Sequence, residues 1–511
     1  MAQAPAVSAS LGAHKQAYKE ALRELDAADF ERRLIAKDST LWNGDQAVIG
    51  QRLGWLTVPQ GMVGRVRELS AFAEDVRETG FERVVLLGMG GSSLAPEVMS
   101  GTFGSAPGHP SLLLLDTTDP GTISNAERTL DFERTLFVVS SKSGTTTETA
   151  SLHSYFAEKQ ARPLKNFIAI TDPGTPLEAR AKAEGFRTVY LNRPDVGGRF
   201  SALSYFGLVP AAAIGIDVSR VLGTATSLDF RSGIELGAML GGLSADGRDK
   251  VTFVATSSLR GFGAWAEQLL AESTGKLGKG IIPVDGEPLG APDVYGEDRV
   301  FVYLRLSGES GPDDPLGALE AAGHPVITIT LGDRYDLGAE FLRWEIATAA
   351  AGAILGINPF DEPNVAEAKE RTSEILRQRA PGDAGGATEL DAERAIQELL
   401  ASSKPGDYLA ILAFIPRAAE SDGLLTRLRV AVRDQAKLAT SVGYGPRYLH
   451  STGQLFKGGP DTGLFIQVVA DDTIDVPIPG APYSFGTLKR AQALGDRQAL
   501  QSRGRRVVRI D

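Results

Sequence analysis

Two stretches rich in glycine and hydroxyl residues directly follow apolar runs of the chain. GMGGSSLAPE at 88–97 follows the run at 84–87, and SSKSGTTTETA at 140–150 follows the run at 136–139. Such a stretch at the start of a helix offers backbone N–H groups and hydroxyls to an anion, and the helix dipole favours negative charge there. On neighbouring strands, both loops would converge on one ligand. The pattern therefore predicts a phosphate-binding site.

Two other interpretations of these loops stay open on the residues alone. Gly88 and Gly90 approximate a dinucleotide fingerprint and Asp116 follows the next apolar run, but Ser93 stands where the third glycine is required. Nicotinamide binding also gives no reason for the second loop. That loop could instead be a Ser/Thr-rich turn that caps a helix.

The composition limits the possible partners. The chain carries 53 basic and 64 acidic side chains, a net charge of −11, with no long basic run, so neither nucleic acid nor a membrane is expected as a partner. An anionic phosphate ligand must then be bound by local N–H groups, hydroxyls and a few placed cations. The absence of cysteine excludes disulfides and thiolate chemistry and fits a cytoplasmic protein. Residues 1–15 lack the pattern of a signal peptide.

The 511 residues are too many for one core, and the pattern predicts an α/β fold with several units. We expect an N-terminal helical segment at 1–80, a first α/β domain at 81–232, a second with following helices at 233–380, and a C-terminal α/β segment at 388–511. Short apolar runs that alternate with helical stretches predict doubly wound parallel sheets. The expected strands are 84–87, 112–115, 136–139, 167–170, 189–191, 251–255, 280–284, 300–304, 325–330, 408–414, 464–469 and 507–510.

Helical spacing of apolar residues predicts helices at 14–37, 62–78, 337–355 and 424–440. The uncharged stretch between Arg199 and Asp217 contains Gly207 and Pro210, and we expect a buried helix there rather than a membrane span. The GDAGGA stretch at 382–387 is flexible by composition.

The two loops together resemble the sugar isomerase (SIS) domains of the phosphoglucose isomerase family. The likeness extends to VGGRFSALSYFGLVP at 196–210, EQLLAESTGK at 267–276 and NPFDEPNVAEAKE at 358–370. It is closest to the isomerase part of the transaldolase/phosphoglucose isomerase fusions of some bacteria, although nothing in these residues resembles a transaldolase barrel.

The resemblance implies a homodimeric, cofactor-independent enzyme of glycolysis and gluconeogenesis that interconverts glucose 6-phosphate and fructose 6-phosphate through a cis-enediolate. An enzyme that also accepts mannose 6-phosphate, and a regulator that binds sugar phosphate without turnover, are the alternatives. The five histidines are scattered, so the sequence predicts no metal site.

Glu272 is the expected base for proton transfer. Gln268 and Glu272 are four residues apart and share one helix face, whereas Glu267 points elsewhere. The resemblance aligns Glu272 with the proton-transferring carboxylate and Gln268 with a substrate contact. Arg199 follows two glycines that allow close approach of the backbone, and it keeps its charge at every relevant pH, so we expect it to stabilise the enediolate.

The resemblance also assigns the phosphate contacts and the sugar-ring contact. Lys369 matches the lysine that contacts the ring oxygens, whereas Glu362 stands where the family commonly has glutamine. A negative charge at that position is unfavourable for an anionic substrate unless it pairs with a cation or points away. The expected phosphate contacts are Gly91, Ser92, Ser141, Lys142, Ser143, Thr146 and Thr149.

The ring-opening histidine is displaced in the sequence. Family members carry it between the glutamate and lysine motifs, where this chain has only His324, in AAGHPVITIT at the start of an expected core strand. YLHSTGQLFKGG at 448–459 resembles the family's histidine string, so we assign the role to His450. In the family this histidine comes from the neighbouring subunit. A contact within the chain and one between subunits are both possible here, and we predict the latter.

Overall fold

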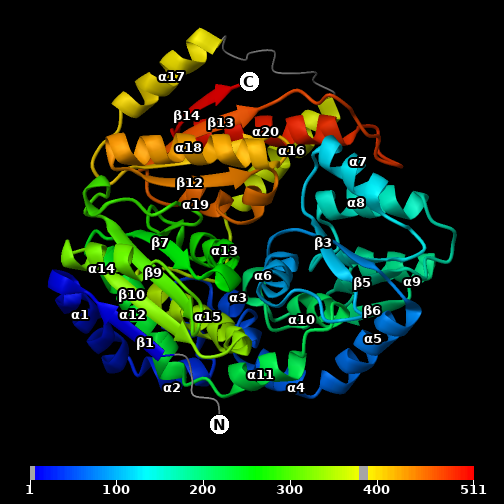
Figure 1. Ribbon diagram of the computed structural model, residues 1–511, viewed down its shortest axis with the longest axis horizontal. Helices are drawn as coiled ribbons and strands as arrows, with labels where there is room; N and C mark the ends of the chain where they lie inside the picture. The colour runs from blue at the N-terminus through cyan, green and yellow to red at the C-terminus, as the bar shows by residue number, and fades with distance from the viewer. Residues whose placement is uncertain (1–5, 379–388) are drawn as a thin grey trace.

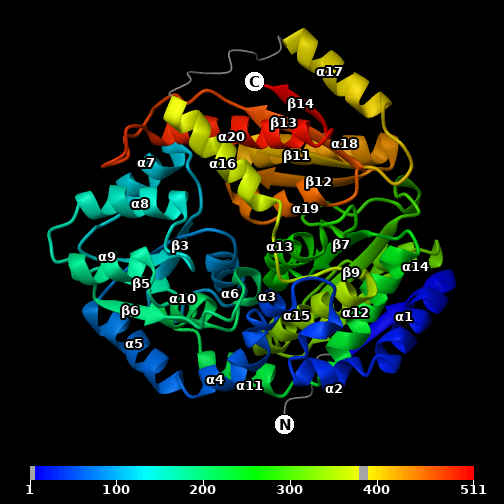
Figure 2. The same cartoon turned by 180° about the vertical axis from the view of Figure 1, so that it is seen from behind.

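The fold is described by a computed structural model that covers residues 6–378 and 389–511. The stretch at 382–387 that composition predicts as flexible lies outside the described residues. Those residues form three β-sheets with helices packed around them, which confirms the predicted α/β fold (Figures 1 and 2). No helix in the described ranges is long and apolar enough to cross a membrane.

The first sheet has the strand order β3-β2-β4-β5-β6, and all its neighbouring strands are parallel. Its strands are β2 (Arg83–Gly88), β3 (Ser111–Leu115), β4 (Thr135–Ser140), β5 (Phe167–Thr171) and β6 (Thr188–Leu191). Gly88 pairs in register with Ser140, so the two hydroxyl-rich loops leave neighbouring strands at the same edge. Helices α6 (Leu94–Phe103), α7 (Pro120–Thr129), α8 (Thr147–Glu158), α9 (Pro176–Glu184) and α10 (Tyr205–Ala213) accompany the sheet. Every residue of α10 is buried, as predicted for the uncharged stretch.

The second sheet has the order β1-β10-β9-β7-β8. Its strands are β1 (Ala6–Ser10), β7 (Lys250–Ala255), β8 (Ile282–Val284), β9 (Arg299–Leu306) and β10 (Val326–Leu331), with helices α12 (Phe230–Ala245), α13 (Phe262–Thr274), α14 (Asp313–Ala321) and α15 (Leu337–Ile354). We did not predict β1, which pairs antiparallel with β10 and places part of the expected helical segment in this sheet. Glycine allows α12 and α15 to pack closely, because a Cβ on Gly237 would lie 2.5 Å from the carbonyl oxygen of Ala347.

The N-terminal helices are shorter than predicted. The range 14–37 contains α1 (Lys15–Ala27) and α2 (Phe30–Ile35), which are separated at Asp29, where φ is +53°. Next come α3 (Gln46–Gly50), α4 (Val58–Val63) and α5 (Val66–Thr79), which ends at the left-handed Gly80. α1 packs against α12, α5 against α10, and α11 (Val218–Thr226) against α15, so these helices belong to the cores of both α/β units.

The third sheet is parallel, in the order β12-β11-β13-β14. Its strands are β11 (Tyr408–Phe414), β12 (Ala439–Tyr444), β13 (Gly463–Val469) and β14 (Arg506–Ile510), with helices α17 (Glu389–Ala401), α18 (Ala419–Ala436), α19 (Gly453–Gly458) and α20 (Phe485–Ser502). The predicted helix 424–440 is wrong at its end, because the chain turns at Lys437 with φ of +57° and continues as β12. α16 (Val365–Gln378), predicted among the helices that follow the second unit, packs beside α20 of this unit (Figure 2). The domain boundaries themselves stay a prediction.

Candidate active site

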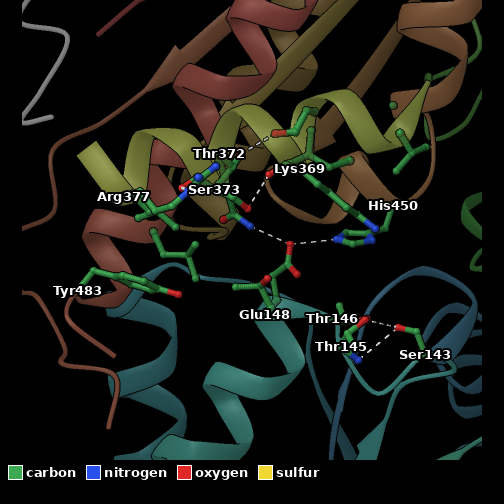
Figure 3. A pocket seen from close by; sticks show the side chains of 18 of the residues that line it. Ser143, Thr145, Thr146, Glu148, Lys369, Thr372, Ser373, Arg377, His450 and Tyr483 are labelled. Carbon is green, nitrogen blue, oxygen red and sulfur yellow. Dashed lines mark hydrogen bonds and ion pairs between the residues drawn. The ribbon is translucent and has the colours of Figure 1, made fainter. Parts of the chain in front are cut away.

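The second hydroxyl-rich loop opens into a cavity of about 580 Å³ between the first and third units. Its walls come from this loop and the start of α8, from α16, from the segment 449–457, and from α20 (Figure 3). Ser143, Thr146, Lys369 and His450, four of the predicted site residues, all line it. Segments more than 300 residues apart in the sequence thus supply hydroxyls, a lysine and a histidine to one volume.

Glu148 and His450 form an ion pair inside this cavity. The Oε1 atom of Glu148 lies 2.9 Å from Nε2 of His450 and accepts a second hydrogen bond, of 2.7 Å, from Nε2 of Gln492 (Figure 3). Burial acts to raise the pKa of Glu148, but the charge and hydrogen bond of His450 outweigh it and hold that pKa below its usual value. Glu148 is therefore a carboxylate that orients the imidazole.

Sequence reasoning missed both Glu148 and Gln492. Glu148 belongs to the second loop motif, in the first turn of α8, and an acid is favoured at a helix N-terminus whatever its function. Its position beside the loop hydroxyls could have been noticed, but its partner could not, because Gln492 stands in α20 with no recognisable motif around it.

The prediction that His450 comes from a neighbouring subunit is wrong. His450 reaches Glu148 within one chain, because η9 (Arg447–His450) follows β12 of the third unit and packs against the first loop. A Cβ on Gly90 would lie only 2.7 Å from the carbonyl oxygen of His450. The third unit thus supplies in cis the histidine that the resemblance placed on a partner.

Glu272 and Gln268 lie on one face of α13, next to this histidine. The Nε2 atom of Gln268 donates to Oε2 of Glu272 over 3.1 Å and to the carbonyl oxygen of His450 over 2.8 Å. Burial raises the pKa of Glu272, the charge of Glu362 raises it further, and Arg199 opposes both effects. A raised carboxyl pKa suits a group that must accept and return a proton near neutral pH. Neither Gln268 nor Glu272 lines the cavity in Figure 3. The two hydrogen bonds of Gln268 connect Glu272 to His450, which does line it.

Arg199 is buried and fully engaged. It donates from Nε to Ser273 Oγ (2.8 Å), from Nη1 to Glu362 Oε2 (3.0 Å), and from Nη2 to the carbonyl oxygens of Pro359 (2.8 Å) and Asp361 (2.9 Å). Nη1 also lies 3.4 Å from Oε1 of Glu272. These partners account for the five N–H groups of a guanidinium, so Arg199 acts as a fixed charge beside Glu272. Glu362 pairs with the Arg199 cation, so its negative charge is compensated and does not disfavour an anionic substrate.

The remaining predicted phosphate contacts divide into two groups. Within the second loop, Ser141 Oγ lies 3.0 Å from Thr146 Oγ1, and Ser143 Oγ lies 2.9 Å from Thr145 Oγ1. Ser141 and Thr149 line a smaller cavity of about 110 Å³ beneath the loop, and among the described residues the buried Oγ1 of Thr149 has no hydrogen-bond partner. The loop hydroxyls therefore lie close together and can form further hydrogen bonds.

Lys142 and the first loop have contacts within the protein, and their phosphate contacts stay a prediction. The ammonium of Lys142 pairs with Asp172 and donates to the carbonyl oxygen of Pro194 over 3.1 Å, and the side chain does not line the cavity. A Cβ on Gly91 would collide with the carbonyl oxygen of Gly198, so this glycine lets the first loop contact the backbone that carries Arg199. Ser92 is buried and its N–H bonds to Met89 over 3.1 Å.

Asp116 suggested a dinucleotide ligand, and His324 stands at the family's usual place for the ring-opening histidine, but both have structural partners. Asp116, the candidate ribose ligand, accepts a 2.8 Å hydrogen bond from Nη1 of Arg447, which also pairs with Glu97, and this argues against the nicotinamide interpretation. His324 packs against Phe301 with Nε2 3.2 Å from the carbonyl oxygen of Pro292, as expected for a structural histidine. Among the described residues, no group of three or more His, Asp or Glu side chains could hold a metal ion.

Comparison with known proteins gives one consistent result. The sequence profile of the family described as phosphoglucose isomerase matches residues 71–233. The glucose-6-phosphate isomerase of Rubrobacter xylanophilus is 32% identical over 375 residues, which cover 61% of this chain and 85% of the relative. A hypothetical protein from Thermus thermophilus superposes with a TM-score of 0.61 at 25% identity, over 75% of this chain and all of the other. A glucose-6-phosphate isomerase from Chlamydia trachomatis shares the fold, with a TM-score of 0.51 at 21% identity over 72% of this chain and 81% of the other.

Proposed function

The chain belongs to the phosphoglucose isomerase family, and we propose that it interconverts glucose 6-phosphate and fructose 6-phosphate, without a cofactor, as an enzyme of glycolysis and gluconeogenesis. One observation carries the proposal: the loop hydroxyls, Lys369 and the Glu148–His450 pair line one cavity, and Gln268 joins His450 to Glu272. A phosphate site, a ring-opening pair and a proton-transferring base are thereby adjacent within one chain.

The phosphate would bind at the second loop. Ser143 and Thr146 line the cavity, and Thr146 is the N-cap of α8, so the loop hydroxyls and the positive end of a helix dipole lie at the same place. Lys369 lines the opposite wall, on α16. Contacts from two walls fix where the reacting carbons lie relative to the bound phosphate.

Ring opening requires a proton donor at the ring oxygen and a base at the anomeric hydroxyl. Lys369 and His450 both line the cavity, and the carboxylate of Glu148 holds the imidazole in place through their hydrogen bond. We assign the ring-opening step to Lys369 and His450, with Glu148 as a positioning residue.

Glu272 then moves the proton between C2 and C1. It removes the C2 proton of the open aldose, the electron pair forms the C1–C2 double bond, and a proton reaches the former carbonyl oxygen to give the cis-enediol. Return of the proton from Glu272 to C1 and loss of the hydroxyl proton at O2 complete the ketose. The fixed charge of Arg199 stabilises the enediolate character of this step.

The direct test is turnover. Purified full-length protein is mixed with fructose 6-phosphate and EDTA, and glucose 6-phosphate is followed through a coupled dehydrogenase. Turnover above a heat-killed control supports the proposal, and its absence rejects the enzyme interpretation. The same assay with mannose 6-phosphate measures the breadth of specificity.

Assembly as a homodimer and a cytoplasmic location complete the proposal. The family resemblance supports both, and the absence of cysteine fits a reducing compartment. Light scattering on the purified chain measures the assembly, and the dimer is not needed to supply His450.

A further inference from the structure

A second cavity, of about 230 Å³, lies on the opposite side of α13, between the second and third units. It opens where β8 and β12 end, and these edge strands of two different sheets are in contact. The carboxyl ends of parallel strands are the usual place for ligands in α/β proteins. Small-molecule sites measure about 300–1,000 Å³, so this cavity suits a small ligand.

Arg429 is the most unusual group in this cavity. Its side chain is 4% exposed, and its hydrogen bonds go to neutral oxygens: the hydroxyl of Thr440 (3.1 Å), the carbonyl of Thr440, and the carbonyl of Asp285 (2.9 Å). Among the described residues no carboxylate lies within 4 Å of the Arg429 guanidinium. Burial lowers the pKa of Arg429, although the charges of Glu287, Asp285 and Glu267 act to raise it. These carboxylates offset only part of the cost of burying the cation, and an anion in the cavity would offset more of it.

Arg417 adds a second guanidinium, which has no close ion-pair partner among the described residues. Its closest ion-pair contact is 3.8 Å, from Nε to Oδ2 of Asp422, which already accepts a 2.6 Å hydrogen bond from Tyr444. Arg447 also lines the cavity, but Glu97 and Asp116 neutralise it. The two guanidiniums of Arg417 and Arg429 are therefore available to an oxyanion.

Besides Asp422, two carboxyl groups line the cavity and favour a ligand with hydroxyls. Glu267 and Asp285 both line the cavity, and among the described residues the Glu267 carboxyl accepts no hydrogen bond. Burial raises the pKa of Glu267 to about 8 and that of Asp285 to about 6. At neutral pH Glu267 is then a neutral donor and Asp285 a charged acceptor, which together match the two faces of an alcohol group.

We propose that this cavity is a second anion site, which binds a small phosphorylated polyol and acts on the isomerase site through α13 and the 447–450 turn. Both elements are shared: α13 carries Glu267 into this cavity and Gln268 toward His450, and the turn carries Arg447 here and His450 there. A ligand that moves either element changes the bond between Gln268 and His450. The coupling, although not the binding, rests on the isomerase function proposed above.

The test uses glycerol 3-phosphate as the probe. The full chain is first saturated with sorbitol 6-phosphate, which has no carbonyl and cannot be isomerised, and glycerol 3-phosphate is then titrated by calorimetry. We expect binding, weakened about tenfold or more by Arg417→Gln and by Arg429→Lys, since each loses hydrogen bonds to a charged group. Arg394→Gln, at an exposed pair on α17, is the matched control. Glycerol without phosphate is expected not to bind.

Each part of the proposal has its own refutation. If sorbitol 6-phosphate abolishes all binding of the probe, or if both arginine variants bind it as the wild type does, there is no second site. The coupling is tested by kcat at saturating fructose 6-phosphate. Glycerol 3-phosphate is expected to change this kcat in the wild type and not in Arg417→Gln, and an unchanged wild-type kcat overturns the coupling. The binding result stands without turnover, so it is independent of the proposed activity.

Discussion

Glu362→Gln is the change that isolates the electrostatics of the proposed base. Glu362 shares Nη1 of Arg199 with Glu272: the two contacts are 3.0 Å and 3.4 Å. Burial acts to raise the pKa of Glu362, but Arg199 outweighs it and keeps that pKa below its usual value, so Glu362 is ionised at neutral pH. Glutamine keeps the shape and can still accept from Arg199, while the charge is removed.

The size of the effect follows from the geometry. The two carboxylate oxygens lie at most 6.4 Å apart, the sum of their distances to the shared nitrogen. Two unit charges at that separation repel by about 2.6 kcal/mol at an effective dielectric of 20 and by about 1.3 kcal/mol at 40. The Glu362 side chain is 41% exposed, so solvent screening favours the smaller value. Loss of this repulsion lowers the pKa of Glu272.

The assay is the pH dependence of kcat/KM in the direction from fructose 6-phosphate. The base works when deprotonated, so activity falls as the pH drops through the pKa of Glu272. Because the variant lowers that pKa, the acid limb should move to lower pH by about one unit, since 1.36 kcal/mol corresponds to one unit. Glu398→Gln removes a charge from exposed α17 and is the control that should leave the limb in place. An acid limb that stays, or moves to higher pH, refutes the assignment of Glu272 or its coupling to Glu362.

Four further predictions concern the proposed roles. Glu272→Gln should reduce kcat by about 10²–10⁴ while sugar-phosphate affinity, measured by calorimetry, stays near that of the wild type, and near-normal activity would exclude Glu272 as the base. Ser141→Ala with Thr146→Val should weaken binding of sorbitol 6-phosphate by about 1.5–3 kcal/mol for each lost hydrogen bond to the charged phosphate, and unchanged affinity contradicts the loop assignment. Glu148→Gln should lower turnover by up to about 10²-fold, because it removes the carboxylate that positions the His450 imidazole, while the melting temperature checks the fold. Refolding His450→Ala together with Glu272→Gln should restore no activity, because each chain builds its own site, and recovery in mixed assemblies would show that subunits exchange His450 after all.

The sequence predicts the strands that contain an apolar run, including the edge strands β3, β6, β8 and β14, but it misses the edge strands β1 and β12. β11 has the predicted bounds and β2 extends the predicted run by one residue at each end, because a strand buried on both faces is a continuous apolar run. β1 has the sequence AVSAS and is mostly exposed, and β12 has the sequence ATSVGY. Neither contains such a run, and each lies at an edge of its sheet. Their strand conformation depends on one paired neighbour, which a local pattern does not reveal.

The same distinction separates the site residues. The resemblance located Glu272, Arg199, Lys369 and His450, because each stands within a recognisable string of residues. It could not tell that Lys142 turns to Asp172, since that partner stands beyond the next strand and has no motif of its own. The geometry adds a packing role for Gly91, whose lack of a side chain allows contact with Gly198, while its predicted phosphate contact stays a prediction. A motif shows which residue types are present. Whether such a residue binds a ligand or packs against the protein can be decided only from its neighbours in the folded structure.

The position of His450 is set by polar contacts between the first and third units. Lys489 of α20 is buried with Asp119 at 3.0 Å and also pairs with Asp472, and Gln492 accepts from Thr118 over 2.8 Å while it donates to Glu148. Buried ion pairs of this kind contribute little net stability, because desolvation offsets most of their attraction. However, they raise the free energy of any arrangement of the first and third units that leaves one of these charges unpaired. A third unit held in one orientation by such contacts brings His450 to within hydrogen-bond distance of Glu148 without a second subunit, although the two residues are far apart in the sequence.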